Sequence, residues 1–118
     1  MNDMKKSKMY ILVKDGLDVG MATVACAHAS LSGYLTFLEK DKINQSTIVE
    51  DWVSQSFRKA VCSVNDEQFE EAKTYGIIGE DYRIITESSL GGAEVAIVFR
   101  PMVEWEQFFR NLPLYGEK

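Results

Sequence analysis

The 118-residue sequence predicts one α/β domain, because short runs of strand-forming residues alternate with segments of helical periodicity. Its apolar fraction of 46% and charged fraction of 26% are typical of a folded chain and exclude disorder throughout. A single domain over residues 1–118, with its core at about 8–112, fits this length. The order strand, helix, short helix, strand, helix, strand, strand, helix favours a small, mostly parallel sheet between helices.

The first strand is predicted over residues 9–14, where the apolar run MYILV is flanked by lysines. Turn-forming residues follow at 15–20. A helix over residues 20–39 comes next, because apolar side chains recur there with a period of about 3.6 residues. The stripe expected to be buried consists of Met21, Val24, Ala25, His28, Leu31, Leu35 and Leu38.

Residues 21–38 carry no charged side chain and are almost long enough to cross a bilayer. Polar side chains such as Thr23 and Ser32 lower the hydropathy, so a helix packed inside a small α/β domain is the preferred interpretation. Because His28 lies on the apolar stripe, we expect a buried, neutral imidazole with a hydrogen-bond partner, in preference to a general base.

The later elements follow from the same kinds of signal. Helical spacing around Trp52 indicates a short helix, and the next helix has a clear start because Asn65 and Gln68 can form a capping box. The terminal helix is inferred from the spacing of its aromatic side chains after Pro101. Strands are expected over 58–64, 82–86 and 94–100, and helices over 66–75 and 102–110.

Common catalytic signatures are absent from the sequence, which has no GxSxG, Walker loop, CxxC or HExxH motif. Two cysteines, Cys26 and Cys62, and a single histidine cannot build a zinc site, so no metal and no cofactor are expected. So few cysteines fit a reducing, cytoplasmic setting. The net charge of −5 argues against a broad, non-specific nucleic-acid coat.

Glu87 is the main catalytic candidate, because it ends the strand at 82–86 and begins a polar, glycine-rich loop. A carboxylate at this place can be half-buried and reach a substrate, and the neighbouring Ser88 and Ser89 can donate hydrogen bonds to an oxyanion or a phosphate. The alternatives are a solvated loop carboxylate and, for Gly91 and Gly92, a flexible connection between strands.

Taken together, these motifs resemble the type II peptidyl-tRNA hydrolases of archaea and eukaryotes. The clearest likeness is the strand MYILVK, a loop containing Gly20, and the helix MATVACAHASLSGY, whose segments 25–29 and 32–34 fall in register with the family. Trp52 stands seven residues before Lys59, as a tryptophan often does in the family. The likeness spans residues 8–112 and implies a three-layer α/β/α sandwich with a mixed, roughly four-stranded sheet.

Two positions depart from the family pattern. Met21 stands directly after Gly20, where relatives carry a catalytic lysine, and methionine cannot stabilise an oxyanion or a phosphate as an ammonium group does. Glu87 matches an aspartate of the family, and the loop over 88–94 has no arginine or threonine. Whether the chain is an active enzyme is therefore left open by the sequence.

The function that the resemblance implies is hydrolysis of the ester between a peptide or acyl group and the 3′ ribose of tRNA. Glu87 would activate or orient the water, while Ser88, Ser89 and the backbone N–H groups near Gly20 and Gly91 would bind the substrate and its oxyanion. The alternatives are a catalytically silent binding module and a hydrolase of a non-RNA acyl substrate. Lysines and arginines clustered around the Gly20 and Glu87 loops would favour tRNA, and an apolar cleft would favour the alternatives.

Two spatial expectations complete the sequence-based picture. The loops that hold Gly20 and Glu87 should lie side by side at one edge of the sheet, where α/β proteins commonly bind ligands. If the apolar stripe of the first helix faces the sheet, small residues and Phe37 remain for the terminal helix or a second copy to cover. Members of the family are often dimers, so a homodimer through this helix or the Trp52 segment is expected.

Overall fold

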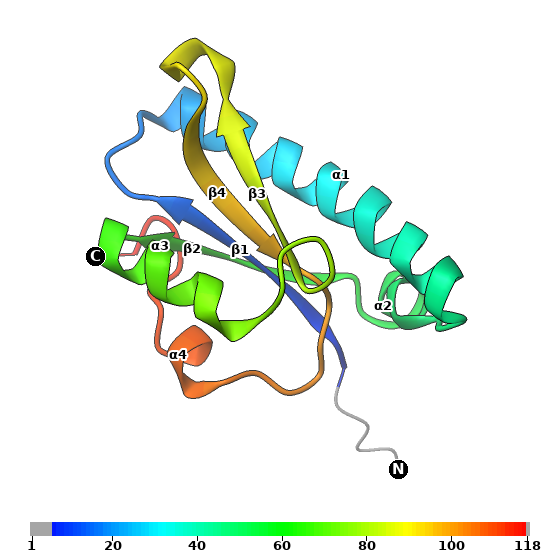
Figure 1. The fold of residues 1–118 in the computed structure, drawn as a ribbon. Helices are drawn as coiled ribbons and strands as arrows, with labels where there is room; N and C mark the ends of the chain where they lie inside the picture. The colour runs from blue at the N-terminus through cyan, green and yellow to red at the C-terminus, as the bar shows by residue number, and fades with distance from the viewer. Residues whose placement is uncertain (1–5, 118) are drawn as a thin grey trace.

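The computed structural model describes residues 6–117 as a four-stranded sheet between two layers of helices (Figure 1). The strand order is β2-β1-β4-β3; β1 pairs with β2 in parallel, whereas β4 is antiparallel to β1 and β3. The mixed sheet is thus confirmed, and the expectation of a mostly parallel one is wrong. The elements are β1 (Lys8–Lys14), α1 (Val19–Asn44), α2 (Ile48–Gln55), β2 (Arg58–Val64), α3 (Asp66–Ala72), β3 (Tyr82–Glu87), β4 (Ala93–Phe99) and α4 (Gln107–Arg110), with short 3-10 turns at Lys73–Tyr75 and Ser88–Leu90.

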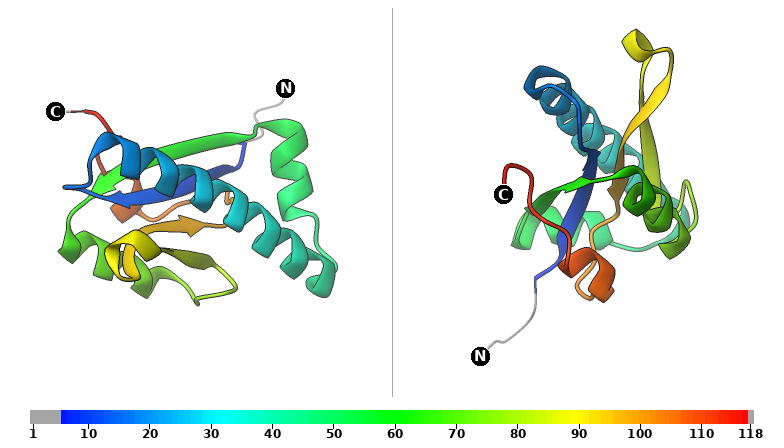
Figure 2. Two further views of the ribbon diagram at one scale, coloured as in Figure 1. Left: turned by 90° about the horizontal axis from the view of Figure 1, so that it is seen from above. Right: turned by 90° about the vertical axis from the view of Figure 1, so that its left-hand side faces the viewer.

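Each face of the sheet carries its own hydrophobic core, because strand residues point alternately to the two sides. From β1, Ile11 and Val13 pack with α1 and α2, whereas Tyr10 and Leu12 pack with α3 and α4. Figure 2 shows α1 and α3 on opposite sides of the sheet. The three-layer α/β/α arrangement agrees with the α/β fold expected from the sequence.

Helix α1 is one continuous helix, as predicted, but its buried stripe is not the expected one. Val24, Leu31 and Leu35 are exposed, the two leucines at 61% and 57%. Glycine and alanine let the helix backbone approach the sheet, and an added Cβ at Gly33 would lie 2.9 Å from Cγ2 of Val98. The side chains that face the sheet are those of Ala22, Ala25, Ala29, Gly33 and Phe37.

The predicted burial of His28 is also wrong, since its side chain is exposed on the outward stripe of α1. Two stripes with helical spacing run along this helix, and periodicity alone does not say which one faces the sheet. The packing depends on side-chain volume, because the small residues allow a closer helix–sheet contact.

The terminal helix is shorter than the predicted span of 102–110. Met102 exchanges two backbone hydrogen bonds with Lys8, at 2.9 and 3.1 Å, which keeps the chain after Pro101 extended, and α4 forms only at Gln107–Arg110. This segment packs through Phe109 on the face of α3, so it does not cover α1. The expectation that the terminal helix covers the first helix is therefore wrong.

The start of α3 is as predicted. The Asn65 side chain accepts a hydrogen bond from the N–H of Gln68 at 2.7 Å, and the Gln68 side chain accepts one from the N–H of Asn65 at 2.9 Å. The helix ends at Ala72 and continues as a 3-10 turn to Tyr75, which together fill the predicted span of 66–75.

Within the described residues, α1 is the one helix long and apolar enough to cross a membrane by length and composition, with 28% of the relevant window buried. Core helices of water-soluble proteins meet the same criterion. Here the stripe of small residues packs against the sheet, so this feature is weak evidence for a membrane span.

Candidate functional site

The β3–β4 turn places Glu87 at the end of a strand in an ordered loop. The Glu87 carboxylate accepts hydrogen bonds from the N–H of Ser89 at 3.1 Å and from its hydroxyl at 2.9 Å. Gly91 and Gly92 have φ angles of 68° and 84°, which allow the chain to return tightly into β4. The turn therefore depends on the backbone conformations that its glycines allow.

These contacts keep the half-buried Glu87 ionised. Hydrogen bonds from the N–H of Ser89, the larger effect, and from its hydroxyl lower the pKa of the Glu87 carboxyl below its ordinary value. Partial desolvation raises this pKa, and the charge of His28 lowers it slightly further. Both the N–H and the hydroxyl of Ser89 thus donate hydrogen bonds to the carboxylate. Ser88 is exposed. The carboxylate is available as a charged group and not as a proton donor.

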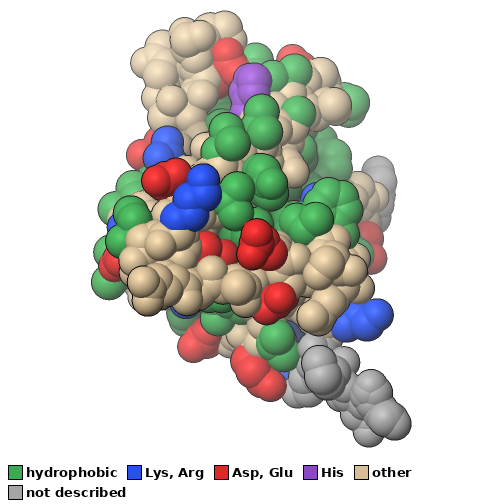
Figure 3. Space-filling model, turned by 90° about the vertical axis from the view of Figure 1, so that its right-hand side faces the viewer, with side chains coloured by type: hydrophobic (Ala, Val, Ile, Leu, Met, Phe, Trp, Pro, Cys, Tyr) green, Lys and Arg blue, Asp and Glu red, His purple; other side chains and the backbone are tan. Residues whose placement is uncertain are grey.

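His28 is near enough to Glu87 for its charge to act on that carboxylate, a proximity that the sequence did not indicate, although within residues 6–117 the two side chains share no hydrogen bond or ion pair. In Figure 3 the imidazole of His28, the single histidine of the chain, lies at the surface next to hydrophobic side chains. The outward stripe of α1 carries it to the side where β3 ends. An ionised carboxylate near an imidazole can stabilise the protonated ring, which is the arrangement that general-base catalysis uses.

The start of α1 lies at the same end of the molecule as the β3–β4 turn (Figure 1, Figure 2). Asp18 caps the helix by accepting a hydrogen bond from the N–H of Met21 at 2.8 Å, and Gly20 is exposed in the first turn. Eight residues separate Gly20 from His28, or roughly 12 Å along a helix. The Gly20 and Glu87 loops thus lie at the same end of the sheet, as the sequence led us to expect.

Comparison with known families identifies the chain. A family model described as Peptidyl-tRNA hydrolase PTH2 matches residues 7–87, more than half of the sequence. The chain belongs to the PTH2 family. The match runs from β1 to the end of β3, so it includes His28 and closes on Glu87. A search of curated proteins found no match. Membership supports a peptidyl-tRNA hydrolase-like function.

The lysine and arginine cluster that would favour tRNA at this end is not seen in the described part of the PTH2 domain. Lys14, the last residue of β1 before the Gly20 loop, lies 3.5 Å from the carboxylate of Asp66. Lys73 lies 2.9 Å from Glu70 and 2.8 Å from Glu94, and the two carboxylates raise its pKa. Both of these cations are therefore engaged with acids.

An apolar groove lies between α1 and α2, and Ala27, the residue before His28, lines it. Its volume is about 500 Å³, and Trp52 forms part of its wall with its ring centroid 4.9 Å from that of Phe57. The ammonium group of Lys59 lies 3.4 Å from the Phe57 centroid, and its pKa is lowered by desolvation. Figure 3 shows hydrophobic side chains exposed over this part of α1. The residues lining the groove are Ala27, Ser30, Leu31, Tyr34, Trp52, Val53 and Phe57.

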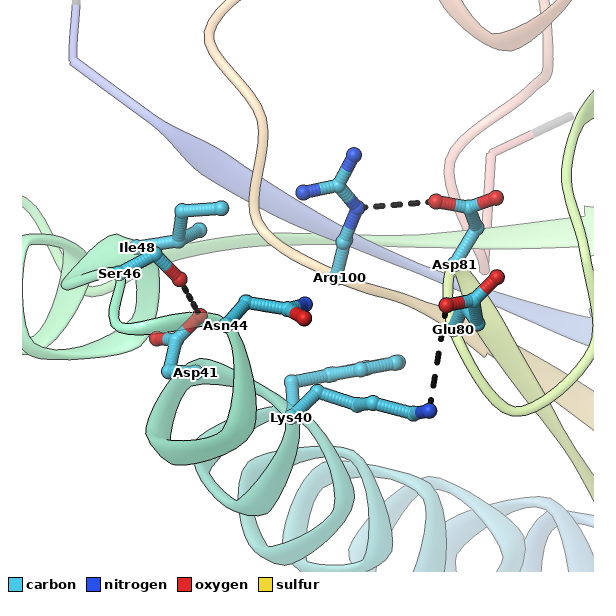
Figure 4. A pocket seen from close by; sticks show the side chains of 9 residues that line it. Lys40, Asp41, Asn44, Ser46, Ile48, Glu80, Asp81 and Arg100 are labelled. Carbon is cyan, nitrogen blue, oxygen red and sulfur yellow. Dashed lines mark hydrogen bonds and ion pairs between the residues drawn. The ribbon is translucent and has the colours of Figure 1, made fainter.

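A second concavity, of about 170 Å³, is polar and has a structural explanation (Figure 4). The buried Asp41 accepts hydrogen bonds from the Ser46 hydroxyl at 2.6 Å and from the N–H of Val49 at 2.7 Å, which fixes the connection between α1 and α2. Arg100 pairs with Asp81 at 3.0 Å on one side of the cavity, and Lys40 of α1 lies 3.9 Å from Glu80. Its charged groups are thus largely used to hold elements together.

Proposed function

We propose that this protein hydrolyses the ester that joins a peptide or acyl group to the 3′ ribose of tRNA. The observation that carries the proposal is the ionised Glu87 carboxylate, with the exposed His28 side chain within electrostatic reach, inside the segment that matches the PTH2 family. Family membership supports the substrate class, and a carboxylate close to an imidazole would supply the chemistry of water activation.

In the proposed reaction, His28 takes a proton from water while the water oxygen attacks the ester carbonyl carbon. Glu87 stabilises the imidazolium that forms. The tetrahedral intermediate then collapses, the carbon–oxygen bond to the ribose breaks, and His28 returns the proton to the 3′ oxygen. The products are a free carboxylate-bearing peptide and a tRNA with a free 3′ hydroxyl.

The remaining candidates take substrate-binding roles in this proposal. Gly20 is too far along α1 from His28 for one carbonyl group to contact both, so its N–H is assigned to a neighbouring anionic group of the substrate. Gly91 donates its N–H to the carbonyl of Ser88 at 3.1 Å, and Ser89 donates to Glu87, so these residues shape the turn that faces the substrate. Ser88 is exposed like Ser89, and its hydroxyl, which has no hydrogen-bond partner within residues 6–117, is assigned to the substrate.

The apolar groove favours a second candidate, a binding module on the same fold that has lost the reaction. Met21 supports this alternative, because by resemblance it replaces the catalytic lysine of the family. The groove of about 500 Å³ has the size of an ordinary ligand site. Such a module would bind its ligand in the groove, and Glu87 would have no catalytic role.

The deciding experiment is release of labelled peptide from peptidyl-tRNA by the purified protein, with Glu87→Gln and His28→Gln as matched variants. We expect turnover by the wild type and losses of about 100-fold or more in each variant, because general-base catalysis contributes about that much. Both side chains contact solvent, so the variants should unfold at the wild-type temperature. Absence of turnover by folded wild type at every salt concentration would support the binding module.

Two further measurements sharpen this result. Met21→Lys restores the family's lysine and should raise the rate by about tenfold or more, since it adds a cation where negative charge develops. The pKa of Glu87 is lowered, so its carboxylate remains charged through mildly acidic pH. A loss of activity in that range would therefore report protonation of a group other than Glu87.

We also propose that two copies of the chain pair through the outward face of α1. One supporting observation is the exposure of Leu31 and Leu35. The other is that residues 21–38 carry no charged side chain. A two-fold axis through this segment would therefore bring no like charges together, although the chain has a net charge of −5. Small groove residues at Ala27 and Ser30 would receive the leucines of the second copy.

A further inference from the structure

A basic cleft lies at the end of the sheet opposite to Glu87. In Figure 1 the start of β1 and α4 are at the bottom of the molecule, and the β3–β4 turn is at the top. The cleft has a volume of about 320 Å³. Its lining includes Lys6, Lys8, Tyr10, Arg58, Trp105 and Arg110.

Strand pairing explains why these cations meet. Lys8 and Arg58 are direct partners in the parallel pairing of β1 with β2, so their side chains point to the same face of the sheet, which is also the face of Tyr10. Arg110 comes from α4, which packs on that face through Phe109. Three segments that are distant in the sequence thus deliver positive charge to one cavity.

The balance of charge in the cleft is opposite to that of the protein. Four cations and one acid, Glu104, line it, which gives 4 − 1 = +3, whereas the whole chain has a net charge of −5. Elsewhere, Lys14, Lys73 and Arg100 lie within 3.5 Å of carboxylates. Three cations of the cleft differ in this respect. Within residues 6–117, Lys8, Arg58 and Arg110 form no ion pair with an acidic side chain. Like charges gathered in one concavity raise the local concentration of anions, so the cleft is suited to an anionic ligand.

The aromatic part of the cleft is held rigidly. The indole N–H of Trp105 donates to the carbonyl of Met102 at 2.9 Å, and Met102 is joined to Lys8 by the two backbone hydrogen bonds described above. The ring of Trp105 meets that of Tyr10 edge-on at 4.7 Å, and the Lys8 ammonium lies 4.9 Å from the Tyr10 centroid. Cations beside a fixed, half-exposed aromatic ring are the combination that binds phosphates and stacks bases.

We propose that this cleft binds the sugar-phosphate backbone of an RNA strand, as a second contact for the body of the tRNA whose ester lies at the other end of the sheet. This inference rests on the proposed function for the identity of the RNA. The length of β1, seven residues at about 3.3 Å each, puts roughly 23 Å between the two ends. The cleft lies on the α3–α4 face and His28 on the outer side of α1, so a tRNA that contacts both must pass around an edge of the sheet, which its length allows.

The test is binding of fluorescently labelled, deacylated tRNA to the full chain over a series of salt concentrations. Deacylated tRNA has no ester, so its binding does not depend on whether the hydrolase reaction occurs. The variant is Arg58→Gln with Arg110→Gln. Its matched control is Lys42→Gln with Arg83→Gln, which removes the same charge from exposed positions outside the cleft.

The cleft variant should bind on the order of tenfold more weakly and lower the slope of log K against log salt by about 1.4 to 1.8, the value for two lost phosphate contacts. The control should keep at least half of the wild-type affinity. Equal losses in the variant and the control, or no loss in the variant, would overturn the proposal. Displacement of tRNA by stoichiometric AMP would also overturn it, because the cleft would then be a mononucleotide site.

Loss of tRNA binding in the cleft variant together with an inactive wild type would reject only the hydrolase. Turnover by the wild type with unchanged tRNA binding by the cleft variant would reject only the cleft. The two proposals therefore fail separately.

Discussion

The two faces of the sheet are packed in opposite ways. On the side of α3 and α4 the large side chains point inward, and Phe99, Trp105 and Phe109 form an aromatic cluster with centroid separations of 4.9 to 6.2 Å. On the side of α1, Gly33 and small alanines point inward, while large side chains such as Leu31 point to solvent.

This difference separates stability from interaction. Aromatic side chains removed from water contribute most of the hydrophobic free energy of a small domain. A helix that packs through glycine and alanine contributes close backbone contact and leaves its larger apolar groups free to bind another molecule. We therefore expect the α3–α4 face to determine stability and the outward face of α1 to determine association.

The largest expected effect is on the aromatic face. Phe99→Ala removes a buried ring at the centre of the cluster and should lower the free energy of unfolding by about 3–5 kcal/mol. Leu31→Ala, on the exposed stripe of α1, should change it by less than about 0.5 kcal/mol. Urea unfolding followed by circular dichroism measures both, and similar losses in the two variants would contradict the proposed division.

A smaller loss is expected from overfilling the contact between α1 and the sheet. Gly33→Leu must displace Val98, so it should destabilise the fold by about 1–3 kcal/mol despite the better helix propensity of leucine. Thr23→Leu on the exposed side of the same helix is the control and should be neutral or slightly stabilising. A Gly33→Leu protein as stable as the control would show that α1 does not approach the sheet closely.

Substitutions on the outward face of α1 should change the molecular mass in solution more than the free energy of unfolding. Leu31→Gln with Leu35→Gln should leave the free energy of unfolding of the monomer within about 0.5 kcal/mol of the wild type, since both side chains are exposed. Light scattering at micromolar concentration should give twice 13.4 kDa for the wild type and 13.4 kDa for the variant. A wild-type mass of 13.4 kDa would reject the homodimer.

The smallest expected difference concerns the two thiols. Burial raises the pKa of Cys62 to about 11, with the charge of Lys8 opposing it and that of Glu117 adding to it, and burial also raises the pKa of the half-buried Cys26. The thiolate is the reactive form, so at pH 8 a disulfide reagent should modify Cys26 first and Cys62 only on unfolding. Mass spectrometry of the labelled peptides gives the order, and faster labelling of Cys62 would place an opening motion on the aromatic face.

Buried Cys62 also links pH to stability. Its folded pKa lies above the ordinary value of about 8.5, so the thiol in the folded protein holds its proton more tightly than in the unfolded chain. The stabilisation is complete below the ordinary value and is lost as the pH rises from there through about 11. The free energy of unfolding should therefore fall in this alkaline range, and Cys62→Ala should remove that component.

Local sequence signals predicted most of the fold. The apolar runs placed four strands to within a residue at each end, and Asn65 with Gln68 marked the start of α3, because strand burial and helix capping depend on neighbouring residues. The sequence also singled out Glu87 and, by resemblance, the PTH2 family. It missed the length of α1 and the extended chain before α4, where Lys8 of a distant strand pairs with Met102.

Only the tertiary structure decided which face of α1 is buried and what its exposed face lies next to. Both stripes of the helix have the same period, and the choice depends on how closely the backbone can approach β4 at Gly33. The proximity of His28 to Glu87 and the cleft formed by Lys8 and Arg58 depend on how segments far apart in the chain pack together. The sequence by itself determined the elements and the chemical groups they carry, and packing decided which of those groups meet, because volume and strand order act only once the chain is folded.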